Sequence, residues 1–320
     1  MNKILQAEPL SIPDTPSLRF LPEGPMALSD SLVSWVGIQH GSVSTVGSLN
    51  LLDLKTNTNQ SFELPGRPGF AFPTSKDNLF VVGCERSLGL FDFSDGSWNV
   101  LIGGVDSGVD NTIINDGWAI GSQLIFGTKD LEFATKKAGL YLYHGAPNEL
   151  VQLRSDQICS NGKALLTDDQ GRHRLLDIDS PTRQLVSYPI DLKTGQLGDA
   201  EVVIDFTGDP AVPDGAVLTP DGTGIVVAMF RPEVAEFGET RLYDLQTGNL
   251  LTTWQTMGSP QNTCPAFVRV DGKLKLLITT AVEHMSDEAQ HQCPNAGRIF
   301  IAETDLHDPG NDLTTRFILS

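Results

Sequence analysis

Four oxygen-bearing side chains recur in short, turn-like segments along the chain. Glu23 lies in Glu-Gly-Pro, Asn115 in Asn-Asp-Gly, Asn161 in Ser-Asn-Gly and Asp214 in Pro-Asp-Gly. Carboxylate and amide oxygens together favour a hard cation such as Ca²⁺, Mg²⁺ or Mn²⁺ over a soft metal. Asn-Gly and Asp-Gly are also common turn dipeptides, so any one segment alone indicates only a turn. Their spacing decides between the two interpretations.

Six segments of this kind occur at a regular interval. One residue taken from each gives positions 23, 69, 115, 161, 214 and 264, which are 46, 46, 46, 53 and 50 residues apart. A period of this length indicates a repeat architecture. Each segment is followed by short strand-like runs, such as LFVVG at 79–83 and IVVA at 225–228. About four short strands per repeat predict an all-β, six-bladed β-propeller.

The predicted propeller occupies residues 1–320 as a single domain, and residues 1–18 form a lead-in that can complete the last blade. A β-solenoid and a double sandwich also contain many short strands. Solenoid coils have shorter periods, however, and sandwiches have no reason to repeat one motif at this interval. In a propeller, equivalent positions on the innermost strands converge near the central channel. The four oxygen-bearing side chains are therefore expected to share one site.

The strands are expected to close in acidic turns. The examples are LLDLKTNTN (51–59), LFDFSDGS (90–97), YPIDLKTGQL (188–197) and LYDLQTGNL (242–250). These are hairpins of the Asp-x-x-Thr-Gly kind, in which the aspartate and the glycine satisfy the tight turn.

The composition excludes several classes of function. Forty acidic against 22 basic residues give a net charge of −18, which repels nucleic-acid phosphates and anionic bilayers. A small molecule is the expected partner, and the chain is expected to be a monomer or a small homo-oligomer. The first 16 residues lack the apolar core of a signal peptide, and no run is long enough to cross a bilayer, which predicts a cytoplasmic protein. Four cysteines without Cys-x-x-Cys spacing argue against a zinc ribbon or a disulfide framework.

Further motifs accompany the six segments. They are PEGPMAL (22–28), INDG (114–117), FGT (126–128), CSNGKAL (159–165), IDSPTRQLVSYPIDLKTGQLGD (178–199), VPDG (212–215), TCPAF (263–267) and LLITTA (276–281). In order and spacing they resemble the senescence marker protein, regucalcin and gluconolactonase family of six-bladed propellers, which includes luciferin-regenerating enzymes. The resemblance covers nearly the whole chain.

The resemblance implies one divalent cation held by Glu23, Asn161 and Asp214. Calcium is the first choice, and manganese, magnesium or zinc are alternatives. Asp214 would also accept the proton of the attacking water. Asn115 would lie beside the metal and contact substrate or water, and Glu132 would contact a substrate hydroxyl.

Two positions depart from this family pattern. Members that act on sugar lactones often have an arginine two residues before the asparagine of Asn-Asp-Gly, where this chain has Ile113. The Asp-Pro that commonly follows is replaced by Ile120-Gly121. The sequence therefore predicts a metal-dependent hydrolase of a lactone or related small ester, in which the ion polarises the carbonyl and an activated water attacks it. A metal-dependent organophosphate hydrolase and a non-catalytic Ca²⁺-binding scaffold are the alternatives.

Other reactive side chains fit less well into a site. His284, His291 and Cys293 share one loop, but the spacing H-x6-H-x-C matches no standard zinc pattern. Cys159 and Cys264 adjoin two of the repeated segments and are expected to be small buried fillers. No G-x-S-x-G follows a strand and opens a helix, which argues against a Ser-His-Asp hydrolase.

Overall fold

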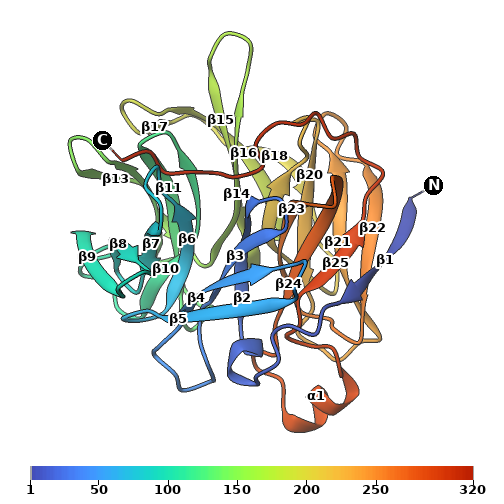
Figure 1. The fold of residues 1–320 in the computed structure, drawn as a ribbon. Helices are drawn as coiled ribbons and strands as arrows, with labels where there is room; N and C mark the ends of the chain where they lie inside the picture. The colour runs from blue at the N-terminus through green and yellow to red at the C-terminus, as the bar shows by residue number, and fades with distance from the viewer. Residues whose placement is uncertain (1, 320) are drawn as a thin grey trace. The chain divides into compact units, whose positions relative to one another are not determined.

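The computed structural model describes residues 2–319, and β-strands make up most of them (Figure 1). The chain divides into two compact units. Unit 1 comprises residues up to 67 together with 208–314, and unit 2 comprises 68–207 together with the residues from 315 onward. The α-helix α1 (Asp287–Gln292) and two 3-10 turns, Ser17–Arg19 and Ser180–Thr182, complete the elements. Of the helices described, none is long and apolar enough to span a membrane.

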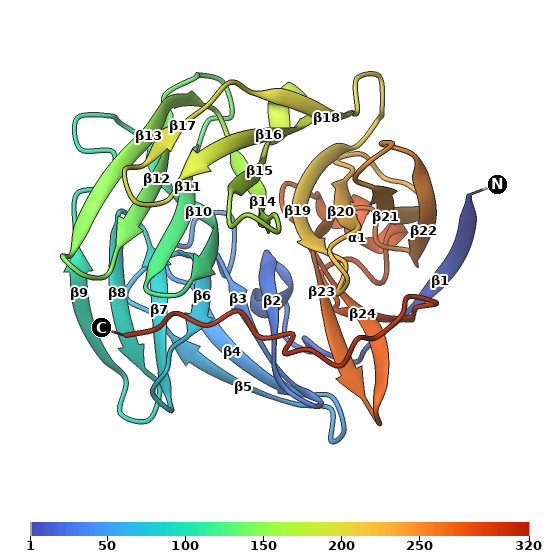
Figure 2. The same cartoon turned by 90° about the horizontal axis from the view of Figure 1, so that it is seen from above.

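Unit 2 contains three sheets, each an antiparallel meander in chain order (Figure 2). The first consists of β6 (Pro68–Pro73), β7 (Leu79–Cys84), β8 (Ser87–Asp92) and β9 (Ser97–Ile102). The second consists of β10 (Thr112–Ile120), β11 (Gln123–Asp130), β12 (Ala138–His144) and β13 (Glu149–Gln157). The third consists of β14 (Ser160–Thr167), β15 (His173–Asp179) and β16 (Gln184–Asp191), with β17 (Gln196–Leu197) and β18 (Glu201–Asp205) both paired to β16. This strand order is that of propeller blades.

Unit 1 contains one sheet of the same kind and one larger sheet. The first is β2 (Pro22–Ser29), β3 (Leu32–Gly37), β4 (Ser48–Asp53) and β5 (Thr58–Glu63). The larger sheet has eight strands, which in spatial order are β19 (Val212–Leu218), β20 (Gly224–Phe230), β21 (Phe237–Asp244), β22 (Leu250–Met257), β1 (Lys3–Pro9), β25 (Phe300–Glu303), β24 (Lys273–Thr280) and β23 (Asn262–Val270). Its two end strands, β19 and β23, pack against each other, so this sheet is nearly closed.

The predicted division into six separate blades is wrong. Within residues 2–319 the strands form five sheets, of which four are blade-like and one has eight strands. The cause is β1, which pairs in parallel with β22 through Lys3–Ala7 and antiparallel with β25 through Glu8 and Pro9. A strand edge offers unpaired N–H and C=O groups. Because β1 occupies two such edges, it joins strands that the repeat pattern assigns to two blades.

Each unit has an apolar core of its own. In unit 1, Trp35 and Trp254 are almost fully buried, and the indole nitrogen of Trp254 donates a hydrogen bond to Glu303 O at 3.0 Å. In unit 2, Leu140 and Leu142 of β12 pack with Leu175 of β15. The β-branched and leucine-rich runs that predict strands are therefore also the runs that fill the cores.

The acidic closing turns predicted from the sequence are confirmed. The carboxylates of Asp53, Asp92, Asp191 and Asp244 each accept the backbone N–H two residues further on, at 2.8 to 3.0 Å. These backbone hydrogen bonds favour the charged form and lower the pKa of Asp53 and Asp191.

Candidate functional site

The six repeated segments are β-bulges in the first strand of each repeat. In unit 1 the register shifts at 23–26 of β2, 213–216 of β19 and 262–264 of β23. In unit 2 it shifts at 68–70 of β6, 114–117 of β10 and 161–164 of β14. A bulge leaves one residue unpaired, bends the strand and redirects its side chains, and bulges are frequent beside active sites. Glu23, Asn115, Asn161 and Asp214 all lie at such bulges.

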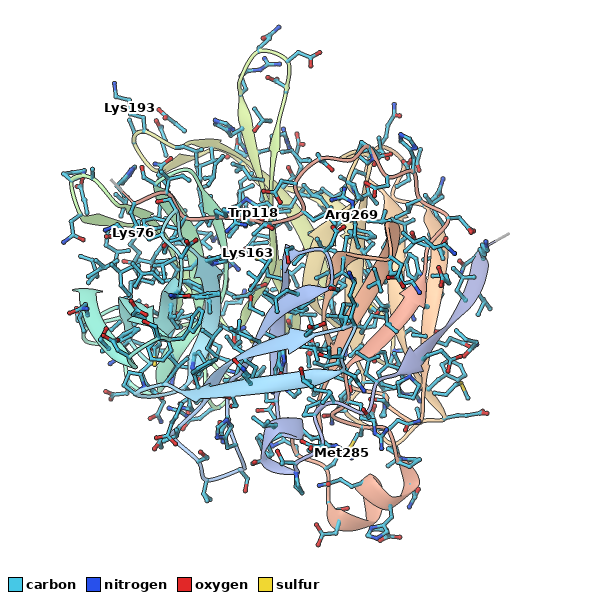
Figure 3. All side chains as sticks on the ribbon, viewed as in Figure 1. Lys76, Trp118, Lys163, Lys193, Arg269 and Met285 are labelled. Atoms are coloured by element: carbon cyan, nitrogen blue, oxygen red, sulfur yellow. The ribbon has the colours of Figure 1, made fainter. Side chains whose placement is uncertain are left out.

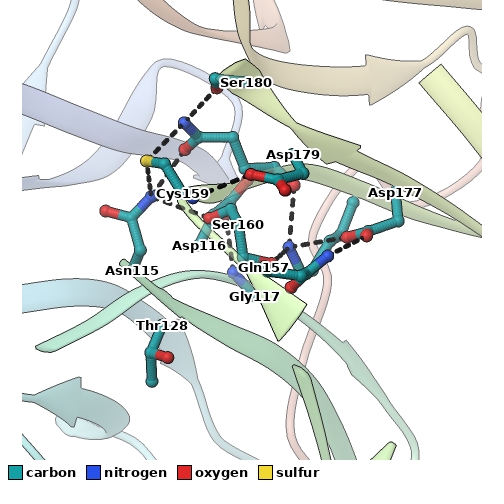
Figure 4. A network of polar contacts seen from close by, with 12 residues as sticks. Asn115, Asp116, Gly117, Thr128, Gln157, Cys159, Ser160, Asp177, Asp179 and Ser180 are labelled. Atoms are coloured by element: carbon teal, nitrogen blue, oxygen red, sulfur yellow. Dashed lines mark hydrogen bonds and ion pairs between the residues drawn. The ribbon is translucent and has the colours of Figure 1, made fainter. Parts of the chain in front are cut away.

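Asn115 and Asn161 are brought together in unit 2. Asn115 Nδ2 donates to Asn161 Oδ1 at 2.7 Å and to Ser160 O at 2.9 Å. Asn161 Nδ2 donates in turn to Ser180 Oγ at 2.8 Å. Both asparagines are buried, and Figure 4 shows the amide oxygen of Asn115 directed away from this network. The two amides are thus held in fixed orientations.

This arrangement suits an oxygen-seeking cation. An amide oxygen has two lone pairs, and in Asn161 one accepts the hydrogen bond from Asn115. The second lone pair is the one that a cation would use. Because Asn161 Nδ2 donates a hydrogen bond to Ser180, the side chain would offer its oxygen, and not its nitrogen, to a cation. The donor chemistry of Asn161 therefore fits a hard divalent ion.

Cys159 and Asp179 hold the segment that carries Asn161 in place. The sequence did not predict this role for either residue. Cys159 is buried, as expected for a filler, but its Sγ also accepts from Asn161 Nδ2 at 3.4 Å. Asp179 accepts the backbone N–H of Cys159 at 2.8 Å. Burial raises the pKa of Asp179, and the backbone hydrogen bonds oppose that rise. The turn that precedes Asn161 is thus tied down by the end of the neighbouring strand, β15.

Two titratable side chains, the partly buried Asp116 and the buried Lys163, lie close to the two asparagines in the sequence. The Asp116 carboxylate accepts the backbone N–H of Gly117 at 2.7 Å. Burial raises the pKa of Asp116, and the positive charge of Lys163 acts in the opposite direction. Lys163 itself is buried and lies 3.1 Å from Asp177. In the sequence, the lysine of Ser-Asn-Gly-Lys shows no sign of this environment.

Glu23 and Asp214 lie in unit 1 on strands that flank β23. Thr263 Oγ1 donates to Pro22 O, the residue before Glu23, at 2.7 Å. Gly215, the residue after Asp214, lies so close to Cys264 that a Cβ there would be 2.6 Å from its Sγ. Glu23 is buried, and its Oε2 accepts the N–H of Gly24 at 2.8 Å. The bulges that carry the two carboxylates therefore contact the same dipeptide, Thr263-Cys264.

Glu132 is placed at the surface of unit 2. Its side chain is 60% exposed and lies 3.7 Å from Lys137 Nζ. Its Oε1 accepts from Asn111 Nδ2 at 3.3 Å. The connection that contains it is held by Asp130, a fully buried carboxylate that pairs with Lys137 at 2.9 Å. Contact between Glu132 and a substrate stays a prediction.

Asp130→Asn is expected to loosen residues 131–136. Besides its ion pair, Asp130 accepts the N–H groups of Glu132, Ala134 and Thr135 at 2.9 to 3.2 Å. Burial alone would raise its pKa, but the pairing with Lys137 and, after it, these backbone bonds lower the pKa to about 2. The ionised carboxylate therefore stabilises the fold fully above the ordinary aspartate pKa of 3.8. This stabilisation is lost as the pH falls through about 2. Hydrogen exchange at neutral pH should show faster exchange of these amides in the variant, and unchanged protection would contradict the assignment.

Gly69→Ala is expected to displace Asn115. A Cβ at position 69 would lie 2.1 Å from Asn115 O and 2.5 Å from Ile114 O. Forcing a methyl group into packed backbone costs ~1–3 kcal/mol or more. Thermal unfolding should reveal this loss, while Gly103→Ala, where the nearest atom is 3.7 Å away, should leave stability nearly unchanged. Equal stability of the two variants would show that β6 does not constrain Asn115.

The two histidines and the cysteine of the loop at 284–293 each contact a different group. His291 Nδ1 lies 2.6 Å from Asp287 O within α1, and His284 lies 3.8 Å from Glu283. Cys293 is buried with its Sγ toward Ala235 O. Across residues 2–319, no three histidine, cysteine, aspartate or glutamate side chains are grouped to hold a metal.

Meandering four-stranded sheets with a bulge in each first strand define an all-β propeller protein. The sequence model of the SMP-30/gluconolactonase/LRE-like region matches residues 21–282, and the chain belongs to this family. The predicted family is thereby confirmed. The matched residues include all four bulges that carry the predicted oxygen donors.

Individual relatives agree with this assignment. The chain is 31% identical over 181 residues to the "Putative sugar lactone lactonase YvrE" of Bacillus subtilis, covering 56% of this chain and 57% of that protein. It is 24% identical to L-arabinolactonase of Azospirillum brasilense over 72% of each chain. Among solved structures, the calcium-binding protein regucalcin of Agrobacterium tumefaciens matches with a TM-score of 0.78 at 25% identity, over 94% of this chain and 95% of that one. The first three curated relatives are matched over only 34% to 57% of their own lengths.

Proposed function

We propose that this chain hydrolyses a lactone or related small ester with the help of one divalent metal ion. One observation carries the proposal: Glu23, Asn115, Asn161 and Asp214 each lie at a bulge of a first strand within the residues that match the family. Two relatives are named as lactonases, which supports lactones as the substrate class.

The proposed ligands of the ion are Glu23, Asn161 and Asp214. All three offer oxygen donors, which suits Ca²⁺ first and Mn²⁺ or Mg²⁺ next. The name of regucalcin as a calcium-binding protein supports the same choice. Three protein ligands on an ion that takes six or more leave positions for substrate and water, as a catalytic site requires and a structural site does not.

The chain's own residues have distinct proposed roles in hydrolysis. Asp214 accepts a proton from the attacking water, whose oxygen bonds to the acyl carbon. The bond from that carbon to the ring oxygen then breaks, the ring oxygen takes up the proton that Asp214 received, and a hydroxy acid is released. Asn115 orients water or substrate through its amide. The bound ion supplies positive charge that stabilises the developing oxyanion.

The proposed substrate carries an apolar substituent. Ile113, which stands where sugar-lactone hydrolases of the family often have arginine, is buried and pairs with Lys129 across β10 and β11. Immediately beyond Lys129, the connection to β12 exposes Leu131 and Phe133 to solvent, by 37% and 44%. Leu131 N bonds to Asn111 O just before β10 begins, and an apolar surface near the start of this strand favours a less polar lactone over an aldonolactone.

A substrate panel tests the proposal. The chain is treated with EDTA and assayed on aldonolactones, aromatic lactones, aliphatic lactones and phosphotriesters, before and after Ca²⁺, Mn²⁺, Mg²⁺ or Zn²⁺ is restored. Metal-dependent turnover of lactones, fastest for the less polar ones, is expected. Turnover of phosphotriesters alone would replace lactonase by organophosphate hydrolase activity. No turnover under any metal would indicate a binding scaffold.

A further inference from the structure

Lys163 is an unusually buried lysine. Its side chain is inaccessible to solvent, whereas Lys76 and Lys193 of the same unit, labelled with it in Figure 3, are exposed. Lysine is almost never fully buried unless it is paired. Its presence in the interior therefore requires an explanation from its neighbours.

Three acceptors surround the Lys163 ammonium group. Nζ lies 3.1 Å from Asp177 Oδ1, 2.7 Å from Ser160 Oγ and 2.8 Å from the backbone oxygen of Asn161. The contacts with Ser160 and Asn161 are hydrogen bonds, and the contact with Asp177 is an ion pair. Asp177 is as deeply buried as Lys163. Asp177 thus compensates the positive charge, and the hydrogen bonds of the ammonium group go to Asn161 and the residue before it.

The bulge in β14 makes these bonds geometrically feasible. Asn161 pairs with Ile178 of β15 and Ala164 pairs with Leu176, so three steps along β14 match two along β15. Gly162 and Lys163 lie in the bulge itself. The lysine side chain can therefore turn back onto Asn161 O and fix the bulge from within.

The same bulge carries the bonds that orient the amide of Asn161. The hydroxyl of Ser160 accepts a hydrogen bond from Lys163. The backbone oxygen of Ser160 accepts another from Asn115 Nδ2 at 2.9 Å (Figure 4). Asn115 also donates to Asn161 Oδ1. A shift of the Ser160–Asn161 backbone would therefore disturb both amides at once.

Stability alone does not account for this ion pair. Replacing a buried pair by apolar residues of similar volume is often neutral or stabilising. An apolar pair could not bind Asn161 O or Ser160 Oγ, however, and would leave both acceptors without their present donor. The specific contribution of Lys163 is to hold these two oxygens.

We propose that Lys163 and Asp177 form a positioning pair that fixes the bulge at Asn161 and thereby aims the Asn161 amide oxygen at the bound cation. The inference rests on the proposed function, because it gives Asn161 the role of a metal ligand. The pair contacts neither substrate nor the reacting atoms in this account. It acts through Asn161.

The test compares Ca²⁺ binding in matched variants. Lys163→Met with Asp177→Asn removes both charges at nearly constant shape. Arg269→Met with Asp308→Asn removes a well-formed bidentate pair elsewhere on the chain, with N···O distances of 2.6 and 2.7 Å. Isothermal titration calorimetry on EDTA-stripped protein measures the Kd for Ca²⁺, and thermal unfolding measures stability. Should the double variant not fold, Asp177→Asn alone takes its place.

The first double variant is expected to bind Ca²⁺ about 10–100-fold more weakly, the range typical when a residue behind a metal ligand is removed. The Arg269 and Asp308 control should bind as the parent does. Added to Asn161→Ala, the Lys163 and Asp177 changes should weaken binding no further, since both act through the same ligand. A Kd within about threefold of the parent, or a full additional loss in the Asn161→Ala background, would overturn the positioning role.

A second readout separates this inference from the proposed function. The side-chain amide protons of Asn115 and Asn161 are assigned by NMR from Asn115→Asp and Asn161→Asp variants. Lys163→Met with Asp177→Asn should shift both amide pairs, whereas the control variant should shift neither. If the parent binds no Ca²⁺ or Mn²⁺, the proposed metal site fails, and unshifted amides would independently overturn the positioning pair.

Discussion

Asp214→Asn is expected to lower kcat/KM for lactone hydrolysis by about 10²–10⁴-fold, the contribution of a general base. The amide keeps the shape and one oxygen of the carboxylate but cannot accept the proton of the attacking water. Ca²⁺ should still bind, more weakly, because an amide oxygen is a neutral ligand. Activity is measured at saturating metal, so that the loss reports on proton transfer.

The chain offers a matched control for this substitution. Asp221 lies in a second Pro-Asp-Gly, at the opposite end of β19, where its carboxylate accepts from Thr219 and Thr223. Asp221→Asn should leave hydrolysis unchanged. Full activity of Asp214→Asn with metal bound would remove Asp214 from its proposed role as base.

Glu23→Gln is expected to have the largest effect on metal affinity. Glu23 supplies one of the two negative charges in the proposed ligand set, and its carboxylate is already oriented by the N–H of Gly24. Mutation of a residue that hydrogen-bonds to a metal ligand typically weakens metal binding ~10–100-fold. Loss of a charged ligand itself should weaken Ca²⁺ binding by more than this. Calorimetric titration of the stripped protein measures this, and activity should return only at high metal concentration.

Glu63→Gln serves as the control for this second prediction. Glu63 is exposed at the end of β5 in the same sheet as Glu23, so its charge contributes to the overall acidity but not to the proposed ligand set. Parent-like affinity in Glu63→Gln and a large loss in Glu23→Gln would separate direct ligation from the general attraction of an acidic protein. Similar small losses in both would contradict ligation by Glu23.

The repeated segments could be predicted from the sequence because each is a local structure. A bulge depends on only a few adjacent residues. Asn115 and Asn161 therefore recur in the sequence at the interval of the repeat, as do the strands β10 and β14 that carry them. The closing turns at Asp53 and Asp244 are equally local. For both kinds of segment, chemistry and conformation are encoded in adjacent residues.

Pairings between distant residues could not be predicted in the same way. Lys3 of β1 pairs with Thr252 of β22, and no repeat in the sequence indicates this pairing. The pairing merges two groups of strands into one sheet. Lys163 likewise has the sequence context of a surface lysine. It is buried because Asp177, on the next strand, compensates its charge. Such features depend on contacts that a repeat pattern does not describe.

Lactone hydrolysis by this chain should depend on one bound divalent metal ion. The chain is stripped with EDTA, its metal content is measured, and hydrolysis of the best lactone of the panel is followed as Ca²⁺ or Mn²⁺ is added back. Hydrolysis should stop on stripping and return in full at one metal ion per chain. Undiminished lactone hydrolysis by chains that hold no metal would contradict a role for the ion in catalysis.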